Sequence, residues 1–175
     1  MRFANECRNP KYLTPFKFKP YEFPKEFCIV VDTREQASPL LLDNPPKGLM
    51  VMRDCCKDGD YQVKSIDDFC IEKKYFADLY SYCGPEFESK TRKKLERMKA
   101  IIDNGGWCGL LIDNRESDIF KWQEHTKINP ECIRGALNSI RMRYRIHVYF
   151  SPSKEHSIRF IVDSAIKWWN IKHEL

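Results

Sequence analysis

Short apolar runs alternate with amphipathic segments along this chain, and this alternation restricts its fold more than any other feature. The runs 27–32, 107–113 and 146–150 are mostly apolar. Runs of this length are typical of strands buried on both faces of a sheet. Between and after them, apolar residues recur at helical spacing in the segments 89–103, 130–144 and 154–171. The pattern predicts an α/β protein in which helices cover both faces of a mixed central sheet.

Further elements are expected in the first half of the chain. Strands are predicted at 49–53, 60–63 and 69–73, with a tight turn at Asp67 and Asp68. Together with the first apolar run, they would form a β-meander. A short helix is expected over 75–83, because apolar residues there follow helical spacing and Gly84-Pro85 ends the pattern. Asn129 before Pro130 indicates the start of a later helix.

The length of 175 residues suits one compact domain, which we place at residues 27–175. Residues 1–26 are rich in proline and aromatic residues, and their four prolines exclude a regular helix. We interpret them as an extended arm on the domain surface. A partly disordered leader is the alternative.

Composition excludes several classes of protein. No apolar run approaches the length of a membrane span, and the N-terminus has no apolar region typical of a secretory signal. The eight cysteines include no C-x-x-C pair, which argues against a zinc site. We therefore expect an intracellular protein with free thiols and no membrane contact, in the nucleus if the source is eukaryotic. The formal net charge of +5 is too small to identify a polyanionic partner by itself.

Three acidic residues and a lysine form the pattern that indicates chemistry. Asp32 ends the first apolar run, and Asp60 begins the third strand. In the returning strand, Glu72 and Lys74 share one face while Lys73 points away, because strand side chains alternate. Carboxylate oxygens suit Mg²⁺, which can activate water and polarise a phosphate, and an ammonium group can stabilise the developing charge. The pattern taken alone also fits a solvated strand face.

The order of these residues resembles a known family. The sequence reads VDTRE at 31–35, GDY at 59–61 and EKKYFAD at 72–78. The XPF-type structure-specific endonucleases carry V-D-x-R-E, then G-D-Y, then E-R-K-x-x-x-D. The resemblance covers residues 27–170, and in the motifs a single letter departs, because Lys73 replaces the central arginine. That change keeps the charge and loses the planar fork of arginine.

The resemblance implies a restriction-endonuclease-like three-layer sandwich of the PD-(D/E)xK type. It also implies hydrolysis of phosphodiester bonds in DNA at branches, flaps or junctions, with Mg²⁺ as the cofactor and Mn²⁺ as its substitute. Asp60 and Glu72 would be the main metal ligands, together with the backbone carbonyl of Lys73. Asp32 would line the same site, directly or through water.

Further roles follow from the same resemblance. Lys74 would be the catalytic lysine, and Arg34 and Glu35 would support the site, with Arg34 placed to contact the phosphate. Asp78 would hold Lys74 or Arg34 by an ion pair. Many members add a tandem helix-hairpin-helix domain that grips DNA, and this chain ends directly after the last nuclease helix.

DNA contacts and partners are expected from basic and aromatic residues. Candidate phosphate contacts are the basic residues of the two middle helices, namely Lys90, Arg92, Lys93, Lys94, Arg97, Arg134, Arg141 and Arg143. An ordinary solvated helix face is the alternative for both runs. Family nuclease domains also pair as homodimers or heterodimers, and we place this surface on the last two helices. Trp168 is a candidate anchor there, unless it packs against the N-terminal arm.

The resulting hypothesis is a metal-dependent endonuclease for branched DNA. One alternative is a non-catalytic DNA-binding partner subunit, since the family includes members that lost the acidic residues. Another is a junction resolvase, or a less structure-selective nuclease, on the same core.

Overall fold

A six-stranded mixed sheet forms the centre of the computed structural model, which describes residues 20–35, 41–42, 45–84, 87–120 and 128–174. The strand order is β2-β1-β3-β4-β5-β6. The strands are β1 (Cys28–Asp32), β2 (Met50–Asp54), β3 (Tyr61–Val63), β4 (Ile66–Lys74), β5 (Trp107–Ile112) and β6 (His147–Phe150). β3 pairs antiparallel with β1 and β4, and every other neighbouring pair is parallel.

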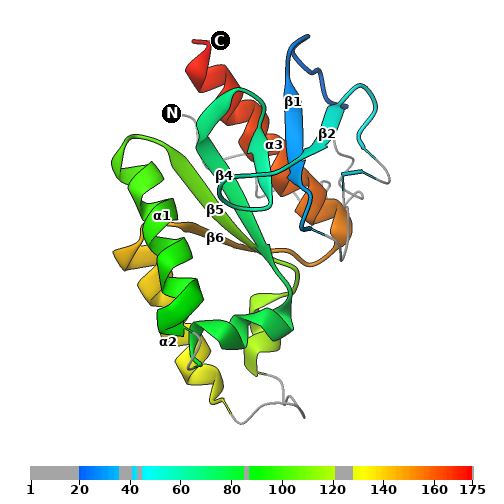
Figure 1. Cartoon of the computed structure of the whole chain (residues 1–175). Coiled ribbons are helices and arrows are strands. Elements are labelled where there is room, and N and C mark those ends of the chain that lie inside the picture. Colours follow the sequence, from blue (N-terminus) through cyan, green and yellow to red (C-terminus); the bar gives the residue numbers. More distant parts are fainter. Residues whose placement is uncertain (1–19, 36–40, 43–44, 85–86, 121–127, 175) are drawn as a thin grey trace, which may run out of the picture.

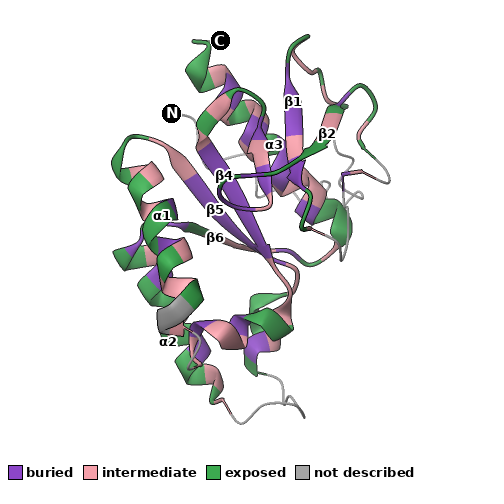
Figure 2. Cartoon of the chain, viewed as in Figure 1, coloured by how far each residue is buried: buried purple, intermediate pink, exposed green. Residues whose placement is uncertain are grey.

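Helices cover both faces of this sheet, which confirms the predicted three-layer α/β architecture. The helices α1 (Arg92–Asp103) and α2 (Pro130–Arg143) lie on one face, and α3 (Lys154–Lys172) lies on the other (Figure 1). Alternation along the strands supplies a separate core to each face. On β5, Leu110 packs toward α1 and α2, whereas Leu111 packs toward α3. Figure 2 shows the resulting band of buried residues along β4 and β5.

The helix ends follow local signals. Asn129 caps α2 by accepting a hydrogen bond from the backbone of Glu131 at 2.9 Å, and Pro130 occupies the first helical position, as predicted. The predicted helix at 89–103 is an α-helix only from Arg92, because residues 87–91 form a π-helical turn. The predicted helix at 75–83 is a 3₁₀ helix, η3 (Phe76–Tyr82). A second short 3₁₀ helix, η5 (Glu116–Phe120), follows β5.

The predicted β-meander is wrong. β2 does not lie between β1 and β3 but runs parallel to β1 at the outer edge of the sheet. The predicted turn at Asp67 and Asp68 is also wrong, because both residues lie within β4. The chain reverses instead at Lys64 and Ser65, where Ser65 adopts a left-handed backbone with φ of 62°. No glycine or asparagine marks this turn in the sequence.

Aromatic stacking connects the end of the predicted arm to α3. Residues 1–19 lie outside the described part of the chain, so most of the predicted arm, and its boundary with the domain, stay predictions. In the described part, the Tyr21 and Phe23 rings stack at 5.3 Å, and the Phe23 and Phe27 rings at 5.9 Å. Phe27 then meets the edge of Trp169 at 5.8 Å. Trp168 is half-buried and donates its indole N–H to Asp68 at 3.0 Å, so Trp169, not Trp168, faces this row of rings.

Two findings bear on the expected class of protein. None of the helices in the described ranges is both long and apolar enough to cross a membrane. The seven cysteines in that part of the chain are free thiols. Cys28, Cys70 and Cys108 are buried, as their positions in apolar runs predict.

Candidate active site

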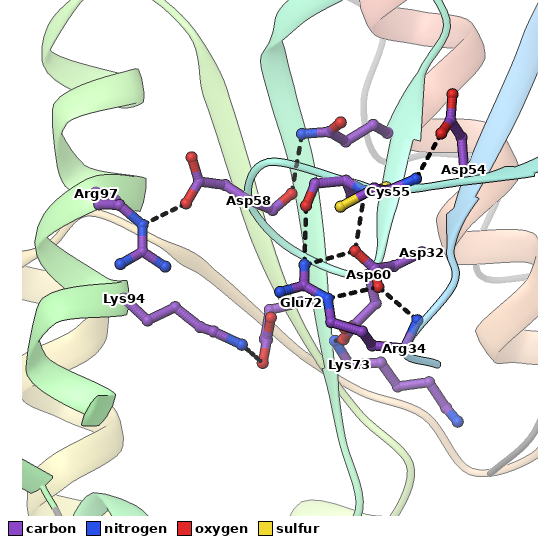
Figure 3. Close-up of polar contacts among 12 residues, drawn as sticks. Asp32, Arg34, Asp54, Cys55, Asp58, Asp60, Glu72, Lys73, Lys94 and Arg97 are labelled. Atoms are coloured by element: carbon purple, nitrogen blue, oxygen red, sulfur yellow. Dashed lines mark hydrogen bonds and ion pairs between the residues drawn. The ribbon is translucent and has the colours of Figure 1, made fainter. Parts of the chain in front are cut away.

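The sheet brings the three sequence motifs together. Because β3 runs antiparallel between β1 and β4, the C-terminal ends of those two strands meet the start of β3. Asp32 is the last residue of β1, Asp60 immediately precedes β3, and Glu72 lies near the end of β4. Figure 3 shows their side chains at this common end of the sheet.

A tight turn at Gly59 positions Asp60. Gly59 has a φ of 72°, and a Cβ atom there would stand 2.8 Å from the carbonyl oxygen of Ile71. Only glycine fits both conditions without strain. The next backbone N–H, of Asp60, donates to the same Ile71 carbonyl at 2.8 Å. The glycine of the GDY motif therefore lets the chain approach β4 closely enough to place the Asp60 carboxylate beside it.

Asp60 is half-buried beside the buried Glu72, and the two side chains carry like charge. Burial and the negative charge of Glu72 raise the pKa of Asp60 to about 7, against the opposing effects of the Lys73 N–H and of two lysines. That N–H donates to Asp60 Oδ2 at 2.6 Å. Since the N–H and C=O of one strand residue point to the same side, the Lys73 carbonyl also faces the β3 side of the strand. Two carboxylates and one carbonyl thus share this corner of the sheet.

The two carboxylate oxygens of Glu72 have different surroundings. Its Oε1 lies 2.6 Å from the Nζ of Lys74 and also 2.6 Å from the Nζ of Lys94, which reaches in from α1. Its Oε2 is buried and has no hydrogen-bond partner within the described ranges. Burial opposes the charge on Lys74, but attraction to Glu72 outweighs it and raises the pKa of the lysine. Glu72 and Lys74 therefore share a face of β4, as strand alternation predicts.

The Asp32 carboxylate is engaged by Arg34 and by the backbone of the loop that follows β2. Its oxygens accept from Arg34 Nε at 2.8 Å and Nη2 at 2.6 Å, and from the backbone N–H of Cys56 at 3.0 Å. Arg34 also donates to the Cys56 carbonyl at 2.8 Å. These bonds, led by that from the Arg34 side chain, lower the pKa of Asp32. The Arg34 side chain as a whole remains 69% exposed, so it can still contact a ligand.

Lys73 and Glu35 lie on the opposite face of the sheet. The Lys73 side chain is fully buried, and its Nζ lies 2.8 Å from the Tyr75 hydroxyl and 3.6 Å from Glu35 Oε1. Asp113, at the end of β5, comes within 3.5 Å of the same Nζ and accepts from Ser157 of α3 at 2.5 Å. We call these five residues the Lys73 cluster. Lys73 points away from the face that carries Glu72 and Lys74, as expected, and Glu35 lies on the same side as Lys73.

Two acidic residues differ from what the sequence suggests. The side chain of Asp78 accepts from the backbone N–H of Tyr75 at 3.3 Å and caps η3. The described residues record no ion pair from it to Lys74 or Arg34, since Arg34 pairs with Asp32. Asp58 was not anticipated, although it is buried and pairs with Arg97 of α1 at 2.6 Å. Its only signal is its place two residues before Asp60, in the same turn.

The predicted DNA-contacting residues differ in their surroundings. Most of them form ion pairs with acidic residues: Lys94 with Glu72, Arg97 with Asp58, Arg92 with Glu96, Arg134 with Glu131, and Arg141 with Glu116. Lys90 and Lys93 are exposed, and the described part of the chain offers them no ion pair. Arg143 lies with its guanidinium 6.0 Å from the Tyr144 ring. Lys94 is the member of the set that reaches the carboxylate site.

Comparison with known proteins places the chain in a family. The mixed six-stranded sheet with helices on both faces matches the fold of XPF-type nuclease domains. The model of the ERCC4 domain matches residues 31–163. The chain therefore belongs to the ERCC4 domain family. No curated protein sequence matches it.

Two solved structures share the fold. XPF from Aeropyrum pernix aligns with a TM-score of 0.62 at 16% identity, over 81% of this chain and 60% of that one. XPF from Aeropyrum pernix in complex with DNA aligns with a TM-score of 0.62 at 16% identity, over 83% of this chain and 66% of that one. This chain thus spans less than two thirds of either XPF chain.

Proposed function

We propose that this chain is a divalent-metal-dependent endonuclease that hydrolyses phosphodiester bonds in branched, flapped or junction DNA. One observation carries the proposal. Burial and the negative charge of the neighbouring Glu72 raise the pKa of the half-buried Asp60, and among the described residues one buried oxygen of Glu72 has no hydrogen-bond partner, beside the ammonium of Lys74. Two carboxylates of like charge in a partly buried site favour a cation between them.

The residues fit Mg²⁺ or Mn²⁺. Among the described residues, no group of three or more acidic, histidine or cysteine side chains is arranged to hold a metal. Mg²⁺ does not need one, because it keeps several waters and is usually bound by one or two carboxylates and by substrate phosphates. Asp60, Glu72 and the Lys73 carbonyl would hold it. The bound ion would supply a water of lowered pKa and would polarise the phosphate.

The residues around this site then have separate tasks. Lys74 lies on the Glu72 side of β4, where its ammonium can stabilise negative charge that develops on a phosphate oxygen. Arg34, fixed by Asp32 and still exposed, can orient a second phosphate. The Lys73 cluster stabilises β4 on the opposite face of the sheet.

DNA is the substrate class that family membership favours. The similar XPF from Aeropyrum pernix has been solved with DNA. In this chain, exposed Lys90 and Lys93 on the α1 side of the site offer charge for phosphate contacts.

A cleavage panel tests the substrate class. Labelled fork, flap, four-way junction and linear duplex of equal length would be incubated with the protein and Mg²⁺. We expect cleavage of at least one branched substrate near its branch point and much slower cleavage of the linear duplex. Equal rates on all four would contradict structure selectivity and favour a plain nuclease. Metal-independent DNA binding without cleavage would favour a non-catalytic partner.

A further inference from the structure

A single carboxylate oxygen, Glu72 Oε1, holds two ammonium groups, and the two differ in origin. Lys74 belongs to the same strand as Glu72, so its position beside Glu72 does not depend on the packing of a helix. Lys94 comes from α1 and spans the gap between helix and sheet (Figure 3). Its side chain is 35% exposed, compared with 23% for Lys74. Lys94 is thus the more solvent-exposed of the two cations.

A second ion pair fixes the helix above the site. Arg97, one turn further along α1, donates to Asp58 at 2.6 Å. Asp58 is buried in the turn that leads to Asp60. The backbone of α1 can therefore stay in place while the Lys94 side chain moves.

A divalent ion at Glu72 would change the balance around this oxygen. It would add positive charge where two ammonium groups already stand, and like charges repel strongly in a partly buried site. The least costly response is for Lys94, the more exposed of the two lysines, to leave, because its ammonium sits on a flexible four-carbon stem that reaches in from another element. The displaced ammonium group of Lys94 then lies at the edge of the site, where it can contact a DNA phosphate.

We propose that Lys94 is an exchangeable positioning residue. It holds Glu72 before the metal binds, and the metal displaces it onto a backbone phosphate of the DNA. The proposal rests on the proposed metal-dependent nuclease function and adds to it a residue that couples metal loading to DNA binding. Two effects of opposite sign follow: removing the charge of Lys94 strengthens metal binding and weakens metal-dependent DNA binding.

The test uses Mn²⁺ alone as the first probe. Free Mn²⁺ would be titrated by electron paramagnetic resonance against the wild type, Lys94→Met, Lys94→Arg and Lys167→Met, with thermal unfolding recorded for each. Lys167→Met is the matched control, because it makes the same substitution at an exposed helical position in α3, on the other face of the sheet. We expect Lys94→Met to bind Mn²⁺ about fivefold more tightly than the wild type. Lys94→Arg and Lys167→Met should remain within twofold of it.

The second probe is fork DNA, whose affinity would be measured by fluorescence anisotropy with Ca²⁺ and again with EDTA. Lys94→Met should lower the affinity in Ca²⁺ and reduce its salt dependence by about one phosphate contact, but change little in EDTA. Equal or weaker Mn²⁺ binding by Lys94→Met, with the fold intact, would overturn the role of Lys94 and leave the nuclease proposal standing. A wild type that binds no Mn²⁺ would overturn both.

Discussion

Consecutive residues of β4 serve opposite faces of the sheet. Glu72 and Lys74 face α1 and the proposed metal, whereas Lys73 faces α3 and is held by two carboxylates and a tyrosine. Removing such a buried cation would leave its acidic partners unpaired. The replacement of the motif arginine by Lys73 is therefore compatible with this chain, because Tyr75 and Asp113 surround one ammonium group closely.

Removing the charge of Lys73 should destabilise the protein. Lys73→Met would leave Glu35 and Asp113 without their shared cation, and breaking a buried pair in this way costs about 3 kcal/mol. Chemical denaturation measures the free energy of unfolding. Lys73→Arg, which introduces the arginine of the XPF-type motif and keeps the charge, should lower the free energy of unfolding by less. A loss below about 1 kcal/mol in Lys73→Met would show that the cluster contributes little.

The raised pKa of Asp60 predicts how metal binding depends on pH. Below the pKa of about 7 the carboxyl is protonated in the metal-free protein, so the ion must displace a proton to bind. The apparent Mn²⁺ affinity should fall about tenfold per pH unit below that pKa and level off above it. Mn²⁺ titrations across this range provide the measurement. An affinity that is flat on both sides of the pKa would contradict the assignment of Asp60 as a ligand.

At the scale of elements, the turn before β3 controls the site. Gly59→Ala would place a Cβ atom 2.8 Å from a backbone oxygen at a positive φ. We expect a loss of about 2 kcal/mol in unfolding free energy and a weaker metal site, because the turn must shift and carry Asp60 with it. Gly105→Ala is a suitable control, since it also has a positive φ but no atom within 4 Å of the added Cβ. Equal Mn²⁺ affinity in the two variants would show that the turn does not position Asp60.

The sequence predicts elements better than it predicts their pairing. Apolar runs and helical spacing locate the sheet and the three main helices, because burial imposes those patterns. They carry no information about neighbours in the sheet, so the edge position of β2 was missed. The turn at Ser65 was missed because its left-handed backbone uses a residue without a turn signature.

Within the site, alternation alone separates Glu72 and Lys74 from Lys73. The bonds of Asp32 to the Cys56 backbone, of Lys94 to Glu72 and of Arg97 to Asp58 join residues far apart in sequence and required the fold. In the sequence, such residues read as charged side chains on helix or loop surfaces, which are ordinarily exposed to solvent. Tertiary packing decides which of them turn inward.

For the whole molecule, pairing through the last two helices stays a prediction, and the fold restricts its geometry. α2 and α3 lie on opposite faces of the sheet, with β6 at the edge between them (Figure 1). A surface shared by both helices must therefore run across this edge. We expect light scattering to give twice the monomer mass at micromolar concentration. The Tyr149→Pro variant in β6 should give the mass of a single chain. A monomeric wild type would contradict self-pairing.

The central claim is that Asp60 and Glu72 hold a catalytic divalent ion. The most direct measurement is the initial rate of cleavage of a labelled fork with Mg²⁺, for the wild type and for Asp60→Asn, with unfolding curves to show that both are folded. We predict Mg²⁺-dependent cleavage by the wild type, abolished by EDTA, and a rate at least about a hundredfold lower for Asp60→Asn. A folded Asp60→Asn variant that cleaves as fast as the wild type would contradict the account.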